Sequence, residues 1–224
     1  MTLPPENIFV VGSSGHAAVI IDILEKQGHF RIAGLIDTFA APGKRFLDYE
    51  VLGPEHELPR LCGLHSARAG IVAIGDNYVR SQVVHRILEI LPEFRFVTAV
   101  HPSAQIARGV TIDPGTAVMA GVVINTNARV GSHCILNTNS SLDHDSAMED
   151  FSSLGPGAAT GGKVRVGRFS VLAQGANVIH GIRIGEHAVV GAGATVLQDL
   201  PGYVVAYGSP ARIIRPRTAG EEYL

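Results

Sequence analysis

The 224-residue sequence contains no Trp, only 13 other aromatic residues and only two Cys. Cys62 and Cys134 are far apart, too few for a disulfide framework and not spaced as zinc ligands, which favours a reducing compartment. No apolar run reaches the roughly 18 residues that a membrane helix needs, and the N-terminal residues lack the basic and apolar segments of a secretory signal. We therefore expect a cytoplasmic protein with no membrane partner.

The chain also lacks an excess of charge of either sign. It has 18 basic and 20 acidic residues, a formal charge of −2, and no run of like charge. This balance argues against nucleic acid as a partner and favours small-molecule chemistry. The hydrophobic fraction of 46% excludes intrinsic disorder as the main state, and the 26 Gly follow no three-residue period, which excludes collagen.

What the sequence does contain is a six-residue repeat in its second half. An aliphatic residue occupies every sixth position from Ile106 to Val196, with Thr160 as the one exception. Small residues predominate four positions after each aliphatic one, and Gly, Asn or Asp predominates three positions after it. Because Gly, Asn and Asp tolerate positive φ, each hexapeptide is expected to be a short strand followed by a tight corner. A period of six fits neither a helix nor a flat strand, and it predicts a solenoid with three sides per coil.

The first half has a different pattern, in which strands and helices alternate. We expect strands at residues 7–11, 32–36 and 71–74, and helices at residues 17–27 and 79–91. This order predicts a small parallel α/β sheet that binds its ligand at the carboxyl ends of the strands. Residues 38–53 have no clean period and are expected to form a loop, and His101-Pro102 marks the domain boundary.

A glycine turn follows the first predicted strand. Gly12 and Gly15 form only a G-x-x-G pair, which is weaker than a full dinucleotide motif. Backbone N–H groups at the start of the next helix could bind a diphosphate, and Asp37, after the second strand, could accept from a ribose or a base. The alternative interpretation is a tight strand-to-helix turn with a solvated Asp.

The most chemically suggestive residue of the repeat is His144, which lies between Asp143 and Asp145. A neutral imidazole beside a carboxylate suits general-base catalysis, although Asp145 can assist only if the corner turns its side chain back.

Residues 18 apart stack about 4.8 Å from one another in such a solenoid. Gly162 would therefore lie directly above His144 and leave room for a ligand. His180 would lie about 10 Å away, too far for the two rings to share a metal ion, and we expect no metal site. The alternative is an exposed corner that merely carries polar residues.

The hexapeptide pattern resembles that of the hexapeptide-repeat acyltransferases. Over nearly the whole chain, the motifs are similar to those of the NeuD/PglD-like sugar O/N-acetyltransferase family, close to GDP-perosamine and UDP-4-amino-sugar N-acetyltransferases. The resemblance rests on Gly12-Ser-Ser-Gly-His16, Ala73-Ile-Gly-Asp-Asn77, His101-Pro-Ser-Ala104, Asp143-His-Asp145, Leu154-Gly-Pro-Gly-Ala158, Gly161-Gly162 and Gly208-Ser-Pro-Ala211.

This resemblance implies an architecture. An α/β Rossmann-like domain that binds a nucleotide sugar would span residues 1–100. A left-handed parallel β-helix that binds acetyl-CoA, with a C-terminal cap, would span residues 101–224. The family also implies a homotrimer with active sites between subunits.

The resemblance further implies N-acetyl transfer from acetyl-CoA to the amine, at C4, of a nucleotide-linked amino-deoxysugar. His144 would be the general base, Asp145 its carboxylate partner and Asn137 a nearby polar contact in the substrate site. Two alternatives stay open: O-acetylation of sialic acid or a related sugar, and a non-catalytic scaffold that binds nucleotide sugars.

Two further groups of residues are assigned by the same resemblance. The candidates for the nucleotide site are Gly12, His16, Asp37 and Asn77. The candidates for acetyl-CoA binding are Ser153, Gly162, His180, Gly208 and Pro210. Gly162 would offer its N–H to the thioester carbonyl, Ser153 stands where many members have a second His, and Ser209 replaces the usual Asn.

Overall fold

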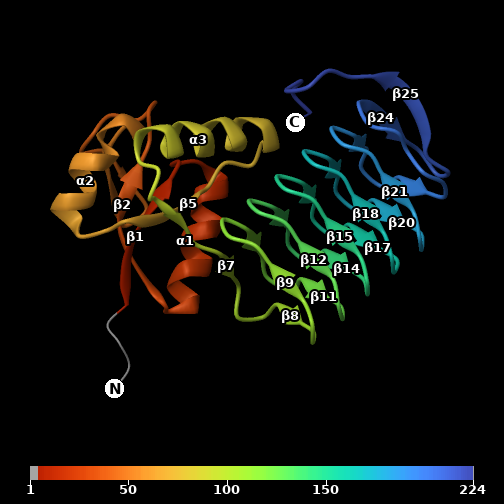
Figure 1. The fold of residues 1–224 in the computed structure, drawn as a ribbon, viewed down its shortest axis with the longest axis horizontal. Helices are drawn as coiled ribbons and strands as arrows, with labels where there is room; N and C mark the ends of the chain where they lie inside the picture. The colour runs from red at the N-terminus through yellow and green to blue at the C-terminus, as the bar shows by residue number, and fades with distance from the viewer. Residues whose placement is uncertain (1–4, 224) are drawn as a thin grey trace.

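The computed structural model describes residues 5–223, which form an α/β domain followed by a β solenoid (Figure 1). The α/β domain contains a six-stranded sheet with the strand order β3-β4-β2-β1-β5-β6. All its neighbouring strands are parallel except β3 and β4. The strands are β1 (Glu6–Val11), β2 (Phe30–Ile36), β3 (Arg45–Phe46), β4 (Tyr49–Gly53), β5 (Ala69–Val72) and β6 (Arg95–Phe96).

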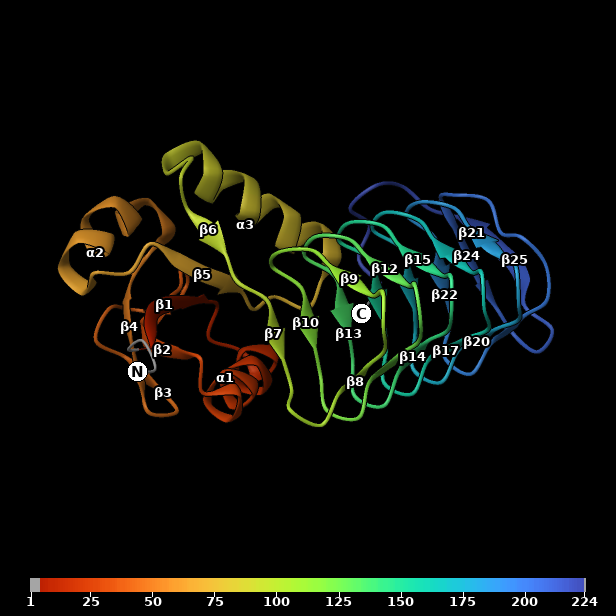
Figure 2. The same cartoon turned by 60° about the horizontal axis from the view of Figure 1, so that its bottom comes forward.

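The helices of this domain are α1 (Gly15–Gln27), α2 (Leu58–His65) and α3 (Asn77–Ile90), with a 3-10 turn at Glu55–Glu57. Helix α1 buries an apolar stripe that includes Ile20 and Leu24, and it ends at Gly28 in the left-handed conformation that a residue without a Cβ adopts readily. Helix α1 also lies beside the first solenoid strand, which joins the two domains into one core (Figure 2). None of the helices within residues 5–223 is long and apolar enough to cross a membrane.

The expectation of a loop at residues 38–53 is wrong. This segment contains the β3–β4 hairpin, and β4 pairs in parallel with β2 through Leu35 and Val51. Strand β4 buries Val51 and Gly53, while its other residues are at least partly exposed. An edge strand of this kind depends on pairing with a distant partner, and its short alternation is easily missed in the sequence.

The solenoid has three sheet faces, and each strand within residues 99–178 pairs in parallel with the strand 18 residues further along. The first face contains β7 (Ala99–Val100), β10 (Ala117–Val118), β13 (Ile135–Leu136), β16 (Ser153–Leu154), β19 (Val171–Leu172), β22 (Val189–Val190) and β24 (Val204–Tyr207), with β25 (Arg212–Pro216) antiparallel at its end. The second face contains β8 (Gln105–Ile106), β11 (Val123–Ile124), β14 (Ser141–Leu142), β17 (Ala159–Thr160), β20 (Asn177–Val178) and β23 (Thr195–Val196). The third face contains β9 (Thr111–Ile112), β12 (Arg129–Val130), β15 (Ala147–Met148), β18 (Arg165–Val166) and β21 (Arg183–Ile184).

The six-residue pattern explains the solenoid core. The second residue of nearly every strand points inward; Leu136, Leu154 and Leu172, for example, stack with no exposed surface. Burying an aliphatic side chain of this size contributes about 1.5–3 kcal/mol. The first solenoid strand, Ala99–Val100, lies one six-residue step before the repeat recognised at Ile106.

One corner of the solenoid carries an aromatic ladder that the sequence reading missed. The rings of His133, Phe151, Phe169, His187 and Tyr203 stack in order at centroid distances of 4.6–5.4 Å. All five residues have φ between 52° and 59°, so the same left-handed corner repeats up the ladder. The ladder faces the α/β domain, where Phe96 packs edge-on against its first ring.

A buried arginine connects this corner to α3. Arg80 is 1% exposed, and its guanidinium donates to backbone carbonyls of Ile74, Gly75 and His133 at 2.9–3.0 Å. It also donates to the Asn77 side chain at 2.5 Å. Because a buried cation needs every donor satisfied, this network fixes the start of α3 against the solenoid.

Candidate active site

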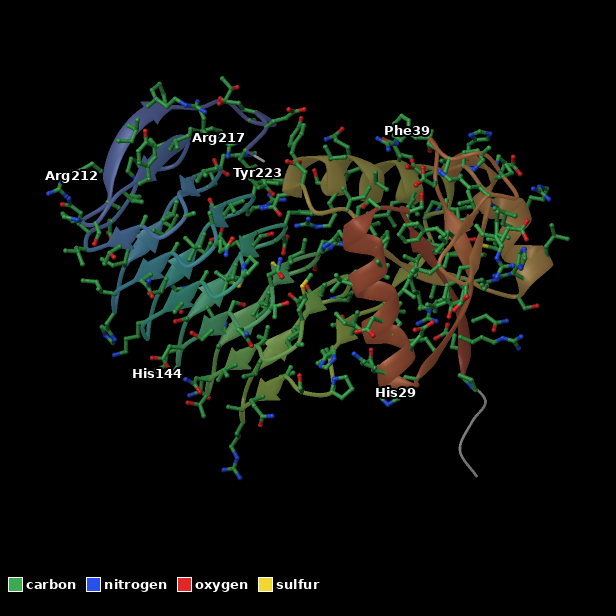
Figure 3. All side chains as sticks on the ribbon, turned by 180° about the vertical axis from the view of Figure 1, so that it is seen from behind. His29, Phe39, His144, Arg212, Arg217 and Tyr223 are labelled. Carbon is green, nitrogen blue, oxygen red and sulfur yellow. The ribbon has the colours of Figure 1, made fainter. Side chains whose placement is uncertain are left out.

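The central pair of the candidate site is His144 and Asp145, in the corner between the second and third faces. Asp145 has φ of 57°, and this left-handed turn directs its carboxylate back to His144 Nδ1 at 2.9 Å. The condition set by the sequence, that the corner must turn Asp145 back, is therefore met. Both side chains are 44% exposed, and Figure 3 shows His144 at the edge of the solenoid.

Hydrogen bonds keep the two flanking carboxylates ionised. The hydrogen bond from His144 holds the pKa of Asp145 below its ordinary value, and a weaker one from Asn127 adds to it. The backbone N–H of His144 and the side chain of Asn125 lower the pKa of Asp143 in the same way. An ionised Asp145 accepts from Nδ1–H, so Nε2 is the unprotonated nitrogen of the neutral ring.

The imidazole of His144 fills the space left by the missing side chain of Gly162, so the ligand space expected there is absent. A Cβ on Gly162 would lie 2.4 Å from His144 Nε2. His180 leans toward the same spot from the far side, so that the two ring centroids are 6.1 Å apart and not about 10 Å. Long side chains can tilt across a residue that has none, which explains the shorter distance.

Thr160, the one polar residue among the aliphatic positions of the six-residue repeat, lies directly beside this corner. Thr160 is 7% exposed, and its hydroxyl accepts from the backbone N–H of Asp143 at 3.1 Å. In the neighbouring coil the corresponding N–H, that of Asn125, donates to the backbone carbonyl of Leu142, so at this corner the Thr160 side chain replaces the backbone acceptor. Thr160 thus supports the backbone that carries His144.

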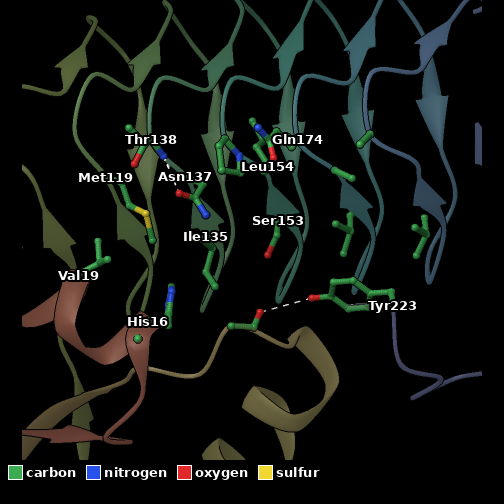
Figure 4. Close-up of a pocket in the computed structure, with 18 residues that line it drawn as sticks. His16, Val19, Met119, Ile135, Asn137, Thr138, Ser153, Leu154, Gln174 and Tyr223 are labelled. Carbon is green, nitrogen blue, oxygen red and sulfur yellow. Dashed lines mark hydrogen bonds between the residues drawn. The ribbon is translucent and has the colours of Figure 1, made fainter.

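A groove of about 580 Å³ lies between the first face and the α/β domain (Figure 4). One wall contains the start of α1, the loop before α3 and one residue near the C-terminus. The opposite wall is the first face of the solenoid and the corner that follows it. The lining residues are Gly15, His16, Val19, Gly75, Met119, Ile135, Asn137, Thr138, Ser153, Leu154, Gly155, Pro156, Val171, Ala173, Gln174, Val189, Ala192 and Tyr223.

The predicted nucleotide residues Gly12 and Asp37 lie together at the carboxyl ends of β1 and β2. Gly12 has φ of 114°, and a Cβ there would lie 3.0 Å from the carbonyl of Ala73, so the turn requires glycine. Asp37 accepts from the hydroxyl of Ser13 at 2.5 Å and from two backbone N–H groups of the next loop. The carboxylate therefore joins the glycine turn to the loop after β2, and Ser13 is a residue of this site that the sequence reading missed.

His16 lies in the first turn of α1 and in the wall of the groove. Burial, with the positive charge of Arg80 as a second cause, lowers the pKa of His16 to about 4. The ring is therefore neutral at physiological pH. Ser14, the residue before α1, makes no side-chain cap, which leaves the first N–H groups of the helix to a ligand or to water.

Asn77 does not face an open site. It is 1% exposed, and its side-chain oxygen accepts from Arg80 at 2.5 Å and from Ser153 at 2.6 Å. Its amide nitrogen donates to solenoid carbonyls at 3.3 and 3.4 Å. All its polar atoms are thus engaged at the domain junction, which corrects the expectation of a nucleotide contact. Ser153, in contrast, keeps one side in the groove.

The remaining predicted residues are distributed over different parts of the solenoid. Asn137 lines the groove, at the corner after the first face, and not at the corner of His144. Gly208 and Pro210 lie in the exposed turn between β24 and β25, where Ser209 donates to Thr195 at 3.1 Å. His144 and the groove therefore occupy different corners of one chain. No group of three or more His, Cys, Asp or Glu within residues 5–223 could hold a metal ion.

Sequence patterns indicated some of the missed residues and not others. The ladder was detectable, because His133, Phe151, Phe169 and His187 recur at 18-residue steps. Arg80 and Tyr223 have no local signal, since their partners lie far away in the sequence.

Fold and site together define a class of protein, the acyltransferases built on a left-handed hexapeptide β-helix. The family model for the PglD N-terminal domain matches residues 7–87. UDP-N-acetylbacillosamine N-acetyltransferase from Bacillus subtilis is 36% identical over 111 residues, which cover 48% of this chain and 48% of that relative.

Solved structures match over greater lengths. PerB from Caulobacter crescentus, in complex with CoA and GDP-perosamine, is 37% identical, with 95% of this chain and 99% of that one covered and a TM-score of 0.86. The acetyltransferase domain of PglB from Neisseria gonorrhoeae, in complex with acetyl coenzyme A, is 25% identical, with 94% and 100% covered and a TM-score of 0.85. The chain therefore belongs to the NeuD/PglD-like family of sugar acetyltransferases, which confirms the resemblance seen in the sequence.

Proposed function

We propose that this protein transfers the acetyl group of acetyl-CoA to the amine, at C4, of a nucleotide-linked amino-deoxysugar. The observation that carries the proposal is the His144–Asp145 pair at 2.9 Å, with Nε2 of the imidazole held against Gly162. A base in this arrangement has a defined tautomer and a fixed direction. Relatives in complex with CoA and an amino sugar support the choice of substrates.

The reaction follows from ordinary acyl-transfer chemistry. The amine nitrogen attacks the thioester carbonyl carbon, and His144 Nε2 takes the proton that the nitrogen loses. Asp145 stabilises the imidazolium that forms. The C–S bond then breaks, and the imidazolium returns the proton to the thiolate of CoA. No covalent acyl-enzyme is needed, so no nucleophilic side chain is required.

Gly162 is the proposed donor to the oxyanion. Its backbone N–H makes no hydrogen bond within residues 5–223 and would donate to a carbonyl oxygen placed beside it; Gly162 itself is buried in the single chain. A fixed N–H donor at such a position stabilises the negative charge that develops on the oxygen, and loss of one such donor typically costs about 10²–10³ in rate. His180, whose ring faces His144 across Gly162, would border the acyl donor at the same corner.

The groove is proposed to bind the nucleotide-linked sugar. The first turn of α1 offers free N–H groups and the positive end of the helix to the diphosphate. Asp37 lies on the nucleoside side, at the carboxyl end of β2. The sugar would then extend from His16 along the first face toward Ser153.

Two subunits are needed to bring the base and the sugar together, because His144 and the groove lie at different corners of one chain. The outward residues of the second face are uncharged: Gln105, Val123, Ser141, Ala159, Asn177 and Thr195. The third face instead presents Arg129, Arg165 and Arg183 to solvent. An uncharged face is the one suited to contact with another copy. A three-fold ring would place the His144 corner of one copy over the groove of the next.

In this arrangement, the CoA chain would run between subunits along the second face, with its adenine end near Gly208 and Pro210. Ser209, in that turn, already bonds to Thr195 of the second face. The free and buried thiols of Cys62 and Cys134 are consistent with the cytoplasm as the place of reaction.

The test is a substrate panel with release of free thiol as the readout. Acetyl-CoA is incubated with UDP-, GDP- and dTDP-linked 4-amino sugars and with their 4-hydroxy counterparts. The proposal predicts thiol release with an amino sugar only, and loss of that release in His144→Ala. Release with the hydroxy sugars alone would establish O-acetylation. Nucleotide-sugar binding without thiol release would establish a scaffold.

A further inference from the structure

The C-terminal segment beyond β25, residues 217–223, returns from the far end of the solenoid to the α/β domain (Figure 1). It ends at Tyr223, which lies in the wall of the groove. We propose that this segment is a strap whose Tyr223 ring positions the sugar of the nucleotide-linked substrate. The inference rests on the proposed function for the identity of the substrate and adds a residue to its binding site.

The strap is held in one conformation by several independent contacts. Arg217 is 7% exposed; its backbone N–H donates to the Tyr203 carbonyl at 2.9 Å, and its guanidinium donates to the carbonyls of His187 and Glu221. The carboxylate of Glu221 pairs with Arg215 at 2.5 Å and accepts from the backbone of Thr218 at 3.0 Å. These bonds close a turn immediately before the terminal residues.

Glycine allows this turn to approach α3 closely. Gly220 has φ of 74°, and a Cβ there would lie 2.7 Å from the ring of Tyr78. Any other residue would meet both backbone strain and a steric clash. The strap is therefore docked tightly on α3, and its path is defined by packing.

Tyr223 connects the strap to the groove by its hydroxyl. The hydroxyl accepts from the backbone N–H of Asn77 at 3.1 Å and faces the carbonyl of Gly75 at 3.4 Å (Figure 4). Burial raises the pKa of Tyr223 to about 12, so the hydroxyl stays protonated and able to donate to Gly75. The guanidinium of Arg217 lies over the Tyr223 ring, 5.7 Å from its centroid. Gly75 also lines the groove, so the ring and the loop before α3 form one wall.

The position of this wall determines which part of a bound nucleotide-linked sugar would contact it. A diphosphate at the start of α1 would place the nucleoside toward Asp37, in the α/β domain. The opposite direction leads along the first face, past Ile135, to Ser153 and Tyr223. Only the sugar of a nucleotide-linked substrate would reach that end. A rigid aromatic ring suits the flat apolar side of a deoxysugar.

The experiment compares binding of a nucleoside diphosphate with binding of the matching nucleotide-linked 4-amino sugar. UDP, GDP and dTDP pairs are titrated calorimetrically into wild-type protein, Tyr223→Ala, Tyr223→Phe and the control Tyr207→Ala. Tyr207 is 50% exposed and does not line the groove. We expect Tyr223→Ala to weaken binding of the sugar conjugate about tenfold while diphosphate binding changes less than about twofold. Tyr223→Phe should keep most of the sugar affinity, because it keeps the ring.

Equal losses for both ligands would assign Tyr223 a merely structural role and overturn the proposal. So would unchanged affinity for the sugar conjugate, or a wild-type protein that binds the diphosphate and its sugar conjugate equally well. Thiol release is followed in the same wild-type preparation. If the sugar conjugate binds and no thiol appears, the proposed transfer fails, while the comparison of Tyr223 variants still decides the role of the strap.

Discussion

The close contact between Gly162 and the imidazole of His144 makes Gly162→Ala a direct probe of catalytic geometry. The added methyl group would lie 2.4 Å from Nε2, 2.6 Å from Cε1 and 2.9 Å from Cδ2 of the imidazole. Ordinary contact begins at 3.4 Å, so Nε2 must move by about 1 Å. That movement takes the ring away from its bond with Asp145 and from its direction toward the amine.

A displacement of about 1 Å typically costs about 10²-fold in rate, or about 2.7 kcal/mol of activation free energy. The loss in the free energy of unfolding of Gly162→Ala should be small. Gly162 does not have a left-handed φ, and the half-exposed imidazole can move toward solvent. We therefore expect kcat for thiol release to fall about 10²-fold, with a change of less than about 1 kcal/mol in the free energy of unfolding.

Gly63→Ala is the matched control, because a Cβ at Gly63 meets nothing within 4 Å. Gly63 lies within α2, where alanine also favours the helix. This variant should keep wild-type kcat and be slightly more stable. A Gly162→Ala enzyme with kcat within about threefold of wild type would refute the assigned position of the base.

Three further predictions follow from the same structure. Asp145→Asn removes the anion that holds the His144 tautomer, so kcat should fall by about 10²-fold or more while the affinity for the nucleotide sugar stays the same. A fall in that affinity as large as the fall in kcat would contradict a purely catalytic role. Arg80→Met leaves several buried carbonyls without a donor and should cost about 3 kcal/mol or more in urea unfolding, whereas the exposed Arg212→Met should cost almost nothing. Burial lowers the pKa of His133 to about 4, so the unfolded chain, with a His pKa near 6.5, binds the proton first as the pH falls. The contribution of His133 to the free energy of unfolding is complete above pH 6.5 and should decline by about 3 kcal/mol between pH 6.5 and 4. If the free energy of unfolding of His133→Phe declined equally over this range, the loss would belong to other groups.

Local sequence patterns predicted the solenoid and its candidate base. The solenoid strands from β7 to β23 repeat the same six-residue unit, so Ile124, Leu142 and their equivalents could be assigned to the core without knowledge of distant contacts. His144 could be proposed as the base because the stacking of residues 18 apart follows directly from that repeat. The direction of Asp145 depended on one backbone angle, which the sequence allowed but did not determine.

The errors have a common physical origin in long-range contacts. Asn77 follows a predicted strand and fits the pattern of a ligand residue, but its partners Ser153 and Ser170 lie 76 and 93 positions away. Strand β4 is recognisable only through its pairing with β2. Tyr223 acquires its place in the groove from a strap that contacts Tyr203 at the end of the solenoid and Asn77 at the start of α3, both far away in the sequence. Such contacts depend on how the two domains meet, which no local period encodes.

The central claim is that the base of one subunit acts on a sugar bound in the groove of the next. It is tested by mixing two variants that should each be inactive: His144→Ala, with an intact groove, and Ala173→Trp, with an intact base and a blocked groove. The variants are coexpressed at equal levels, and thiol release is measured with acetyl-CoA and the preferred amino sugar. In a trimer with random mixing, about one quarter of the sites would receive an intact base from one copy and an intact groove from its neighbour. Recovery of about one quarter of wild-type turnover is the predicted result. Turnover no higher than that of the two variants measured separately would contradict a site shared between subunits.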